Sequence, residues 1–519
     1  MRIGISPMVK DRFDQIYGIS LTTIFLCVGT LTALHHEMWR DEIQAWLLAR
    51  DSISLLDLYR NLKYEGHPGL WHACLLMLSR FTQSPGIMQV FHLLIAATTI
   101  YLFGRYSPFT HLHKFLFAFG YFSLYEYSII CRNYALGVLL ICIFCVLFQR
   151  RYFRFLWVGT VLFLLGHTSV HALIVAITVS FALLVDYISR RNCILAETSI
   201  KESHIVIGFS LMGLGILTSL LQIIPPADSG FAVGWYTHYD ADRLAKVIKT
   251  LTDAFFPVPE ATRHFWGTQW LGQFQFYAKI QFMLSCFLVI WFSLMLFRRP
   301  IAWLIFLLGT IGLLILFYSK YYGSLRHHGF LFIVFVMVAW IYQSCEGPKG
   351  STSIDRFSAI CQKSFRPVLT FILIFHLIGG IIAVCTDYRY VFSYGKATAE
   401  FIQTEGLQEM LIVGDKDSAV STIVGYTEKR SFYYPRSDRF GSFIVWNQAR
   451  IHEVSDEQVI ESAKKIGVES EADVLIILNR MLEQDLVAQH SLTELAKFTG
   501  SIVSSEAFHL YLVAKKGEP

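Results

Sequence analysis

Acidic residues and histidines gather in the segment 35–72, directly after the first long apolar run of the chain. Asp41 and Glu42 stand in the stretch WRDEIQAWLLAR, and Glu65 and His67 stand in the later stretch EGHPGLWH. A partly buried carboxylate can act as a general base towards a hydroxyl group, because burial raises its proton affinity towards working pH. The alternative is a solvated loop in which Asp41 and Glu42 pair with neighbouring arginines.

A second polar group lies between two apolar runs, in the stretch YEYSIICRNY. Glu126 and Arg132 are six residues apart, so on one continuous helix they would face different sides, whereas a broken turn could bring them together. Ionisable groups at membrane depth are costly and usually line a cavity or find a partner. Either the two residues form a structural ion pair between helix ends, or one of them borders a polar pocket.

Histidines mark two further sites. His167 and His171 are four residues apart and would share one face of a helix, but no acidic residue is near, so we favour a hydrogen-bonding role in a pocket over metal ligation.

Arg326 and His327 stand in SLRHHG, just before an apolar run. An arginine there can bind a phosphate with two parallel N–H bonds, or it can anchor the chain to lipid headgroups.

The composition shows what kind of scaffold must position these groups. Of 519 residues, 54% are hydrophobic and only 16% are charged, and the mean hydropathy is +0.48. Soluble domains carry roughly 25% charged residues, so a soluble enzyme is excluded and a multi-spanning membrane protein is predicted. The ten cysteines show neither zinc-binding spacing nor a disulfide framework.

Apolar runs of suitable length predict about eleven transmembrane helices. The candidate spans are 16–34, 86–104, 115–130, 134–149, 155–168, 171–188, 203–224, 279–297, 301–318, 329–344 and 368–386. The two spans within 155–188 could also form one long helix. A cytoplasmic N-terminus places the Lys- and Arg-bearing loops inside and the C-terminus outside, as the positive-inside rule requires. These inner loops are 105–114, 149–154, 189–192, 298–299 and 346–366.

The predicted first outer loop, 35–85, has its own helical pattern. Apolar residues at helical spacing in 43–62 predict an amphipathic helix pair at the membrane interface. The run 68–81 is too short for a span and predicts a helix that dips into the outer leaflet. The later outer segment 225–278 carries aromatic residues, among them Trp266, that suit either sugar stacking or an interfacial belt.

The chain divides into a transmembrane domain, residues 1–390, and a polar tail, residues 391–519. From Asp387 onward there are 14 Lys and Arg residues against 20 Asp and Glu residues, which suits an external location. Strand-like and helix-like stretches alternate in the tail and predict a soluble α/β domain. We expect strands at 410–413, 474–478 and 509–513 and helices at 397–404, 457–466 and 492–498.

The order of WRDEIQAWLLAR, EGHPGLWH and RNY after the first span resembles lipid-linked glycosyltransferases of the GT-C superfamily. The resemblance is greatest to the branch with RgtA/B/C/D-like domains, which is related to protein O-mannosyltransferases and aminoarabinose transferases. It implies a GT-C type fold over residues 10–390 and an acidic catalytic base in the first outer loop. Asp41 matches this base, and Glu42 would orient Asp41, bind the acceptor or serve as the base itself.

The resemblance also implies the remaining site residues. Donor-phosphate binding falls to Arg326, His327, Arg132 and Tyr134, and pocket-lining roles fall to Glu65, His67, Glu126, His167 and His171. Some members of the superfamily need a divalent cation such as Mg or Mn and others do not, and no acidic cluster here demands a metal.

The implied reaction is an inverting transfer of a sugar from a polyprenyl-phosphate donor to a hydroxyl group of a glycan, lipid or protein acceptor. It would take place on the external face of a bacterial inner (plasma) membrane, among membrane lipids and without a nucleic-acid partner. The alternatives are a transporter or lipid flippase and a non-catalytic scaffold. Transporters often contain internal repeats with paired broken helices, and the sequence shows no such repeat.

Overall fold

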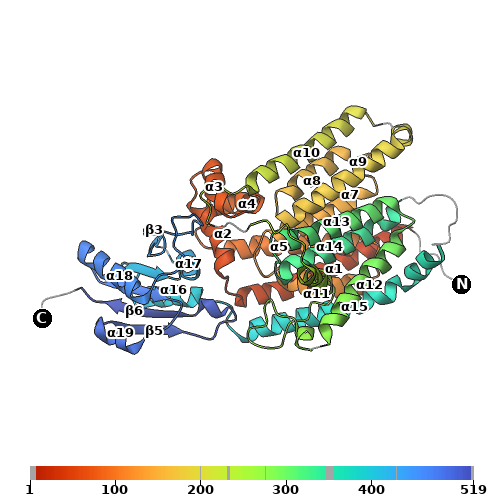
Figure 1. The fold of residues 1–519 in the computed structure, drawn as a ribbon. Helices are drawn as coiled ribbons and strands as arrows, with labels where there is room; N and C mark the ends of the chain where they lie inside the picture. The colour runs from red at the N-terminus through yellow and green to blue at the C-terminus, as the bar shows by residue number, and fades with distance from the viewer. Residues whose placement is uncertain are drawn as a thin grey trace.

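The protein is a bundle of long helices with a sheet-containing tail packed at one end (Figure 1). The computed structural model describes residues 7–198, 200–230, 234–274, 276–345, 355–427 and 429–515. The first helix of the bundle, α1 (Pro7–His35), runs towards the end at which the tail lies.

Eight helices in the described ranges are long and apolar enough to cross a membrane. They are α1, α5 (Gly86–Tyr106), α9 (Val170–Thr198), α10 (Glu202–Ile223), α12 (Tyr277–Leu296), α13 (Pro300–Ser319), α14 (Leu325–Ile341) and α15 (Asp355–Arg389). Two further apolar helices are shorter, α7 (Tyr134–Phe148) and α8 (Phe155–Gly166). Ten of the predicted spans therefore correspond to helices, and 155–188 forms two helices, α8 and α9.

The helix α14 lies at the centre of the bundle. Its side chains are buried on all sides except at Arg326, which agrees with a sequence that is apolar around its whole circumference. The helix α11 (Ala241–Phe255), from the predicted outer segment 225–278, packs against it. Because α14 is enclosed by other helices, its first turn is held at a fixed place in the molecule.

The predicted span 115–130 is not one continuous helix, although the chain here still runs from one end of the bundle to the other: His111 contacts Tyr17 near the start of α1, and Arg132 contacts Asp41 beyond its end. The helix α6 (His111–Ala118) ends early, and a single turn of π-helix, η2 (Tyr121–Glu126), follows after Gly120. A Cβ on Gly120 would lie 2.9 Å from His376 of α15, and one on Gly380 would lie 2.5 Å from the Phe119 carbonyl. The segment is thus pressed against α15 inside the protein, where irregular backbone is tolerated at membrane depth.

Residues 346–354 of the predicted inner loop 346–366 lie outside the described residues. From Asp355 onward the rest of that loop is helical, because α15 begins there and continues through Pro367 to Arg389. The basic stretch 189–192 likewise belongs to the end of α9.

The first outer loop folds into α2 (Arg40–Asp51), α3 (Leu55–Asn61), the 3₁₀ turn η1 (Leu62–Tyr64) and α4 (Leu70–Ser79). The pair of short helices and the short apolar helix therefore match the sequence pattern. The helix α2 differs from a surface helix, since every residue from Glu42 to Arg50 is buried. It lies between α4 on one side and the tail on the other.

The tail is a six-stranded mixed sheet with the order β3-β2-β1-β4-β6-β5. The strands are β1 (Leu411–Asp415), β2 (Phe432–Tyr434), β3 (Arg439–Gly441), β4 (Val474–Leu478), β5 (Thr493–Phe498) and β6 (Phe508–Val513). The neighbours β2, β1 and β4 are parallel, and β3, β6 and β5 pair antiparallel with their neighbours. The helices are α16 (Gly395–Thr404), α17 (Asp417–Tyr426), α18 (Asp456–Ser470) and α19 (Gln484–Gln489).

Alternate residues of the central strands enter two different cores. Ile412 and Leu475 pack with α17 and, beyond it, with α2, whereas Val413 and Val474 pack with α18. The sheet is thus covered on both faces, as the uninterrupted apolar run of β4 requires. Gly425 of α17 approaches Ile43 of α2 so closely that a Cβ would lie 2.5 Å from the isoleucine side chain. This contact holds the tail directly against the first outer loop.

Three predicted strands and two predicted helices of the tail are confirmed as β1, β4, β6, α16 and α18. The helix predicted at 492–498 is wrong, because these residues form the edge strand β5. The stretch contains good helix formers, but it pairs along β6 with an irregularity between Glu494 and Ala496. Tertiary pairing therefore overrides the local helix preference of this segment.

Candidate functional site

Asp41 lies in the first turn of α2, where the chain re-enters a helix after four residues beyond α1. The amino end of a helix carries a partial positive charge that favours a carboxylate at this position. The Asp41 side chain keeps 30% of its surface exposed, whereas the following residues of α2 are buried. The site therefore contains a carboxylate that a molecule outside the protein can reach.

Two arginines from distant parts of the chain meet at this carboxylate. Arg326 Nη2, in the first turn of α14, lies 3.2 Å from Asp41 Oδ2. Arg132 Nη1, in the loop before α7, donates a hydrogen bond of 2.6 Å to the Asp41 carbonyl and lies 3.7 Å from Oδ2. Their side chains are 16% and 14% exposed, so the two cations share one partly accessible acidic partner.

Two tryptophan rings hold the Arg326 guanidinium in place. It lies 5.4 Å from the ring centre of Trp39 and 5.3 Å from that of Trp266, and the two rings meet edge to face. The Tyr127 hydroxyl also donates to the Arg326 carbonyl at 2.7 Å. Such cation–π contacts fix a planar guanidinium while leaving its N–H groups free for an anion.

The pKa of Asp41 reflects two opposing effects. Desolvation raises the pKa, but the guanidinium groups of Arg132, Arg326 and Arg40 outweigh it and hold the pKa below its usual range. Asp41 is therefore an ionised carboxylate at neutral pH whose charge is already balanced by arginines.

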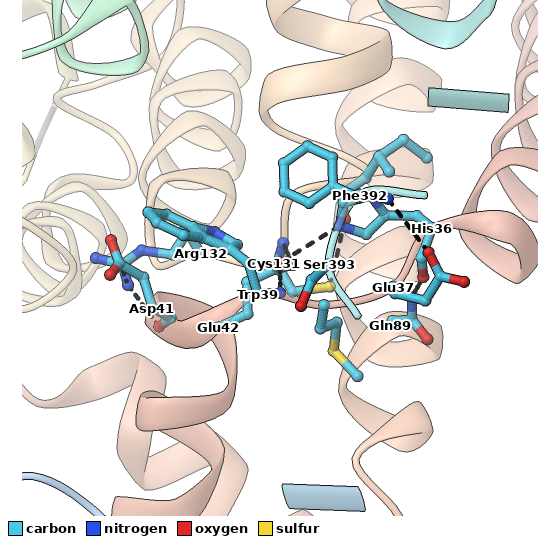
Figure 2. Close-up of polar contacts among 12 residues, drawn as sticks. His36, Glu37, Trp39, Asp41, Glu42, Gln89, Cys131, Arg132, Phe392 and Ser393 are labelled. Carbon is cyan, nitrogen blue, oxygen red and sulfur yellow. Dashed lines mark hydrogen bonds and ion pairs between the residues drawn. The ribbon is translucent and has the colours of Figure 1, made fainter. Parts of the chain in front are cut away.

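Glu42 points to the other side of α2. Its carboxylate accepts hydrogen bonds from the backbone N–H groups of Trp39 at 3.0 Å and Cys131 at 2.5 Å, and it lies 3.3 Å from His36 Nε2. Figure 2 shows Asp41 beside Arg132, whereas Glu42 lies near Trp39 and Cys131. Glu42 is fully buried, and its hydrogen bond from the Cys131 N–H joins α2 to the loop before α7.

A narrow pocket of about 10 Å³, enough room for about one water molecule, lies beside Asp41. It is lined by Asp41, Ala45, Glu65, His67, Trp71, His72, Arg132 and Asn133. Loss of water raises the pKa of Glu65 to about 7, although a hydrogen bond from the Gln44 amide at 2.8 Å opposes the rise. Loss of water and the nearby Arg132 lower the pKa of His67 to about 4. The pocket thus presents a carboxyl that titrates near neutrality and a neutral imidazole.

Glu126, which the sequence analysis grouped with Arg132, does not contact the Asp41 carboxylate. Glu126 accepts hydrogen bonds from Trp266 Nε1 at 3.2 Å and from the Tyr121 hydroxyl at 3.0 Å. Glu126 therefore contacts the same tryptophan that lies against Arg326, whereas Arg132 contacts Asp41. The broken turn separates Glu126 and Arg132 instead of pairing them, and of the two only Arg132 lines the pocket beside Asp41 in the described part of the chain.

Aromatic and imidazole rings pack behind Arg326. His327 stacks on His171 with ring centres 5.0 Å apart, and Tyr134 meets His327 edge to face at 5.6 Å. The Tyr321 hydroxyl lies 3.0 Å from His171 Nε2. His327 Nδ1 accepts from the Ser324 N–H at 2.8 Å and so caps the start of α14. These residues support the helix end that carries Arg326.

The histidines 167 and 171 do not share a helix face. His167 follows the last residue of α8, and its ring contacts the Phe163 carbonyl at 2.9 Å and the Thr218 hydroxyl at 3.0 Å. His171 belongs to α9 and faces His327. Within the described ranges, no group of three or more His, Cys, Asp and Glu side chains could hold a metal ion.

Several residues of the site carry no signal in the sequence. Trp39, Trp71 and Asn133 sit beside named motif residues, but nothing in their types separates them from other apolar or polar loop residues. Glu506 is an acidic residue in an acidic tail, yet its carboxylate accepts a 3.0 Å hydrogen bond from the Arg40 N–H at the start of α2. Arg40 Nη1 also donates to the Ser505 hydroxyl at 3.2 Å. The tail therefore completes the helix end that carries Asp41.

The crystal structure of ArnT from Cupriavidus metallidurans in the apo state is similar to this chain. The TM-score is 0.54, the sequence identity is 10%, and the match covers 96% of this chain and 98% of that chain. No protein-family model and no curated protein sequence matches the chain. The likeness in fold, together with the apolar helices, identifies an integral membrane protein that has the fold of ArnT over 96% of its length.

Proposed function

We propose that the protein is a membrane glycosyltransferase of the GT-C type that uses a lipid-linked sugar donor. The observation that carries the proposal is the meeting of Asp41, Arg132 and Arg326 at one end of the apolar bundle, beside a pocket. The fold shared with ArnT supports it. The donor is a polyprenyl-phosphate sugar, and the acceptor is a hydroxyl group that reaches the site from outside the membrane.

Arg326 and Arg132 bind the donor phosphate. Both guanidiniums face a single carboxylate, and a phosphate offers more oxygen acceptors and more negative charge than a carboxylate does. The cation–π contacts of Arg326 with Trp39 and Trp266 orient its fork before the donor arrives. Arginines so placed also stabilise the phosphate as negative charge grows on it during bond cleavage.

Asp41 is the base. The acceptor hydroxyl gives its proton to the Asp41 carboxylate while its oxygen forms a bond to the anomeric carbon of the sugar. The bond between that carbon and the phosphate oxygen breaks, and the electron pair leaves with the polyprenyl phosphate. A single displacement of this kind inverts the configuration at the anomeric carbon.

Donor binding activates Asp41. In the free protein the arginines hold the pKa of Asp41 below its usual range. When a phosphate takes over these arginines, the carboxylate loses its partners and its pKa rises towards that of a useful base. Glu65, with a pKa of about 7, lines the same pocket and binds the acceptor hydroxyl groups. Glu42 acts as a positioning residue that fixes the first turn of α2.

The test compares a deletion strain with strains that carry the wild-type protein, Asp41→Asn or the matched control Asp57→Asn. Asp57 lies in α3 of the same outer loop and does not line the pocket. Lipid-linked sugars and envelope glycans are profiled by mass spectrometry. We expect the deletion to accumulate one polyprenyl-phosphate sugar and to lose one glycan modification, which the wild type and Asp57→Asn restore and Asp41→Asn does not.

Two outcomes contradict this proposal in different ways. If the deletion changes neither the lipid-linked sugars nor the glycans, the protein is not a glycosyltransferase of this kind. If Asp41→Asn restores the modification as well as the wild type does, the enzyme class stands but Asp41 is not the base.

A further inference from the structure

A second cleft, of about 400 Å³, lies between the first outer loop and the hairpin formed by β2 and β3 of the tail. Four arginines line it, two from the loop (Arg50, Arg80) and two from the tail (Arg430, Arg439). It shares no lining residue with the pocket beside Asp41. The cleft is therefore separate from the candidate active site.

The charge of this cleft is strongly positive. Asp51 is the one acidic residue among the described residues that line it, and both of its oxygens accept from Arg50, at 2.8 and 2.9 Å. In the described part of the chain, no carboxylate lies within ion-pair distance of Arg80, Arg430 or Arg439. Three guanidinium groups thus face one space without a balancing acid, which is the arrangement that binds a phosphate.

The same cleft has an apolar rim that points to a lipid. Ile53, which lines it, is 86% exposed, and Phe440 on the hairpin side is half exposed. Just beyond Arg80, Phe81 is 87% exposed, and the membrane-spanning helix α5 begins only five residues later, at Gly86. Large apolar side chains this close to the start of a span lie at the membrane boundary, where they can enter the lipid.

We propose that this cleft binds the phosphate headgroup of an anionic phospholipid from the adjoining membrane leaflet. The headgroup lies between Arg80 of the outer loop and Arg430 and Arg439 of the hairpin, and its acyl chains pass Ile53 and Phe81 into the bilayer. The bound lipid joins the tail to the membrane surface at a point away from Asp41. A basic site beside exposed apolar residues is the pattern expected for anionic lipid recognition.

The experiment uses the purified full chain in detergent, titrated with phosphatidylglycerol or phosphatidylcholine and examined by native mass spectrometry. The test variant is Arg430→Gln with Arg439→Gln, two exposed residues whose replacement leaves the sheet intact. The matched control is Arg60→Gln with Lys63→Gln, which removes two exposed charges from the same outer loop outside the cleft. Arg80→Gln tests the loop side of the cleft independently.

We expect the wild type to prefer phosphatidylglycerol to phosphatidylcholine. The apparent Kd for phosphatidylglycerol should rise at least about tenfold in the test variant, because each arginine near a lipid phosphate contributes about fivefold to binding. The control should bind like the wild type, and Arg80→Gln should weaken binding in the same direction as the test variant.

Two results overturn the proposal. Equal affinity of the test variant and the control for phosphatidylglycerol would show that the cleft does not hold the lipid. Displacement of phosphatidylglycerol by inorganic phosphate at comparable concentration would show that the cleft binds a free phosphate instead of a lipid headgroup. An unchanged Tm of the test variant shows that any loss of binding comes from the cleft and not from unfolding.

Discussion

Arg326 Nη2 lies 3.2 Å from Asp41 Oδ2, although 285 residues separate the two in the chain. The arginine stands at the first turn of a helix buried in the middle of the bundle, and the aspartate stands at the first turn of a helix clamped by the tail. Two rigid elements therefore meet with opposite charges at their ends. A phosphate that enters between them exchanges one partner of Arg326 for another.

Replacement of Arg326 by Ala should weaken the binding of polyprenyl phosphate at least about tenfold, since a hydrogen bond to a charged group contributes about 1.5–3 kcal/mol. Quenching of tryptophan fluorescence is a suitable measurement, because Trp39 and Trp266 both contact this arginine. Arg263→Ala, on an exposed loop, serves as the control. Unchanged affinity of Arg326→Ala would remove the phosphate role of Arg326.

Replacement of Asp41 by Asn should separate catalysis from binding. The transfer rate should fall at least about 100-fold, the lower range for loss of a general base. Polyprenyl phosphate should bind as tightly as to the wild type or more tightly, because the carboxylate that competes for Arg132 and Arg326 is gone. Weaker binding by Asp41→Asn would mean that the carboxylate holds the arginines in place rather than competing for them.

Replacement of Glu42 should affect folding before it affects chemistry. Glu42→Ala leaves the buried N–H groups of Trp39 and Cys131 without their acceptor, at a cost of about 2 kcal/mol or more in the free energy of unfolding. Glu42→Gln keeps an acceptor and should retain most of the stability and the transfer rate. Thermal unfolding and the transfer assay measure the two effects, and a well-folded but inactive Glu42→Gln would make Glu42 a candidate base again.

The contribution of Glu506 to the stability of the protein should fall as the pH rises from 5 to 8. Burial raises the pKa of Glu506 to about 7 in the folded chain, whereas the glutamate carboxyl of an unfolded chain has a pKa of about 4.3. The folded state therefore holds this proton where the unfolded state has lost it, so the stabilisation is complete below about pH 4 and is lost as the pH passes through 7.

Glu506→Gln should flatten this dependence, because Gln stays neutral and can still accept from the Arg40 N–H. The measurement is Tm between pH 5 and 8, with Glu461→Gln on the exposed face of α18 as the control. Some slope should remain, since Glu65 also has a pKa raised to about 7. An identical slope in Glu506→Gln and the wild type would contradict the prediction.

The orientation in the membrane is also testable. A reporter fused to the C-terminal end should be active on the external side, because the positive-inside rule, applied to the Lys- and Arg-bearing loops, predicts a cytoplasmic N-terminus. Cytoplasmic activity of the reporter would reverse the whole topology, and it would place Asp41 and Arg326 on the inner face.

Much of the fold could be read from the sequence, because long apolar runs predict spanning helices and short apolar runs predict buried strands. The eight long helices and the strand Val474–Leu478 appear where the pattern predicts them. The segment 115–130 is as apolar as a span, but the close approach of Gly380 to the Phe119 carbonyl breaks it, and no local signal reveals that contact. The strand Thr493–Phe498 likewise depends on its neighbour β6 rather than on its own residues.

The sequence motifs identify the residues of the candidate site, but they do not predict how the side chains are arranged. The sequence places Asp41, Arg132 and Arg326 at the same end of the spans, and the structure brings their charges within 4 Å. The opposite directions of Asp41 and Glu42 were not predictable, because neighbours on a helix differ by about 100° and either could face the pocket. The role of Glu506 depends on how the tail docks, which its own sequence does not encode.

The hydrogen bond from Arg40 to Glu506 joins residues 466 positions apart in the chain. During synthesis, α2 leaves the ribosome long before the strand β6 and the turn that carries Glu506. Until the tail has folded and docked, the apolar face of α2 around Ile43 has no cover on that side and the start of the helix lacks its carboxylate partner. The nascent protein therefore cannot assemble a complete Asp41 site during insertion, and a chain that stalls before the tail presents an exposed helix to cellular quality control.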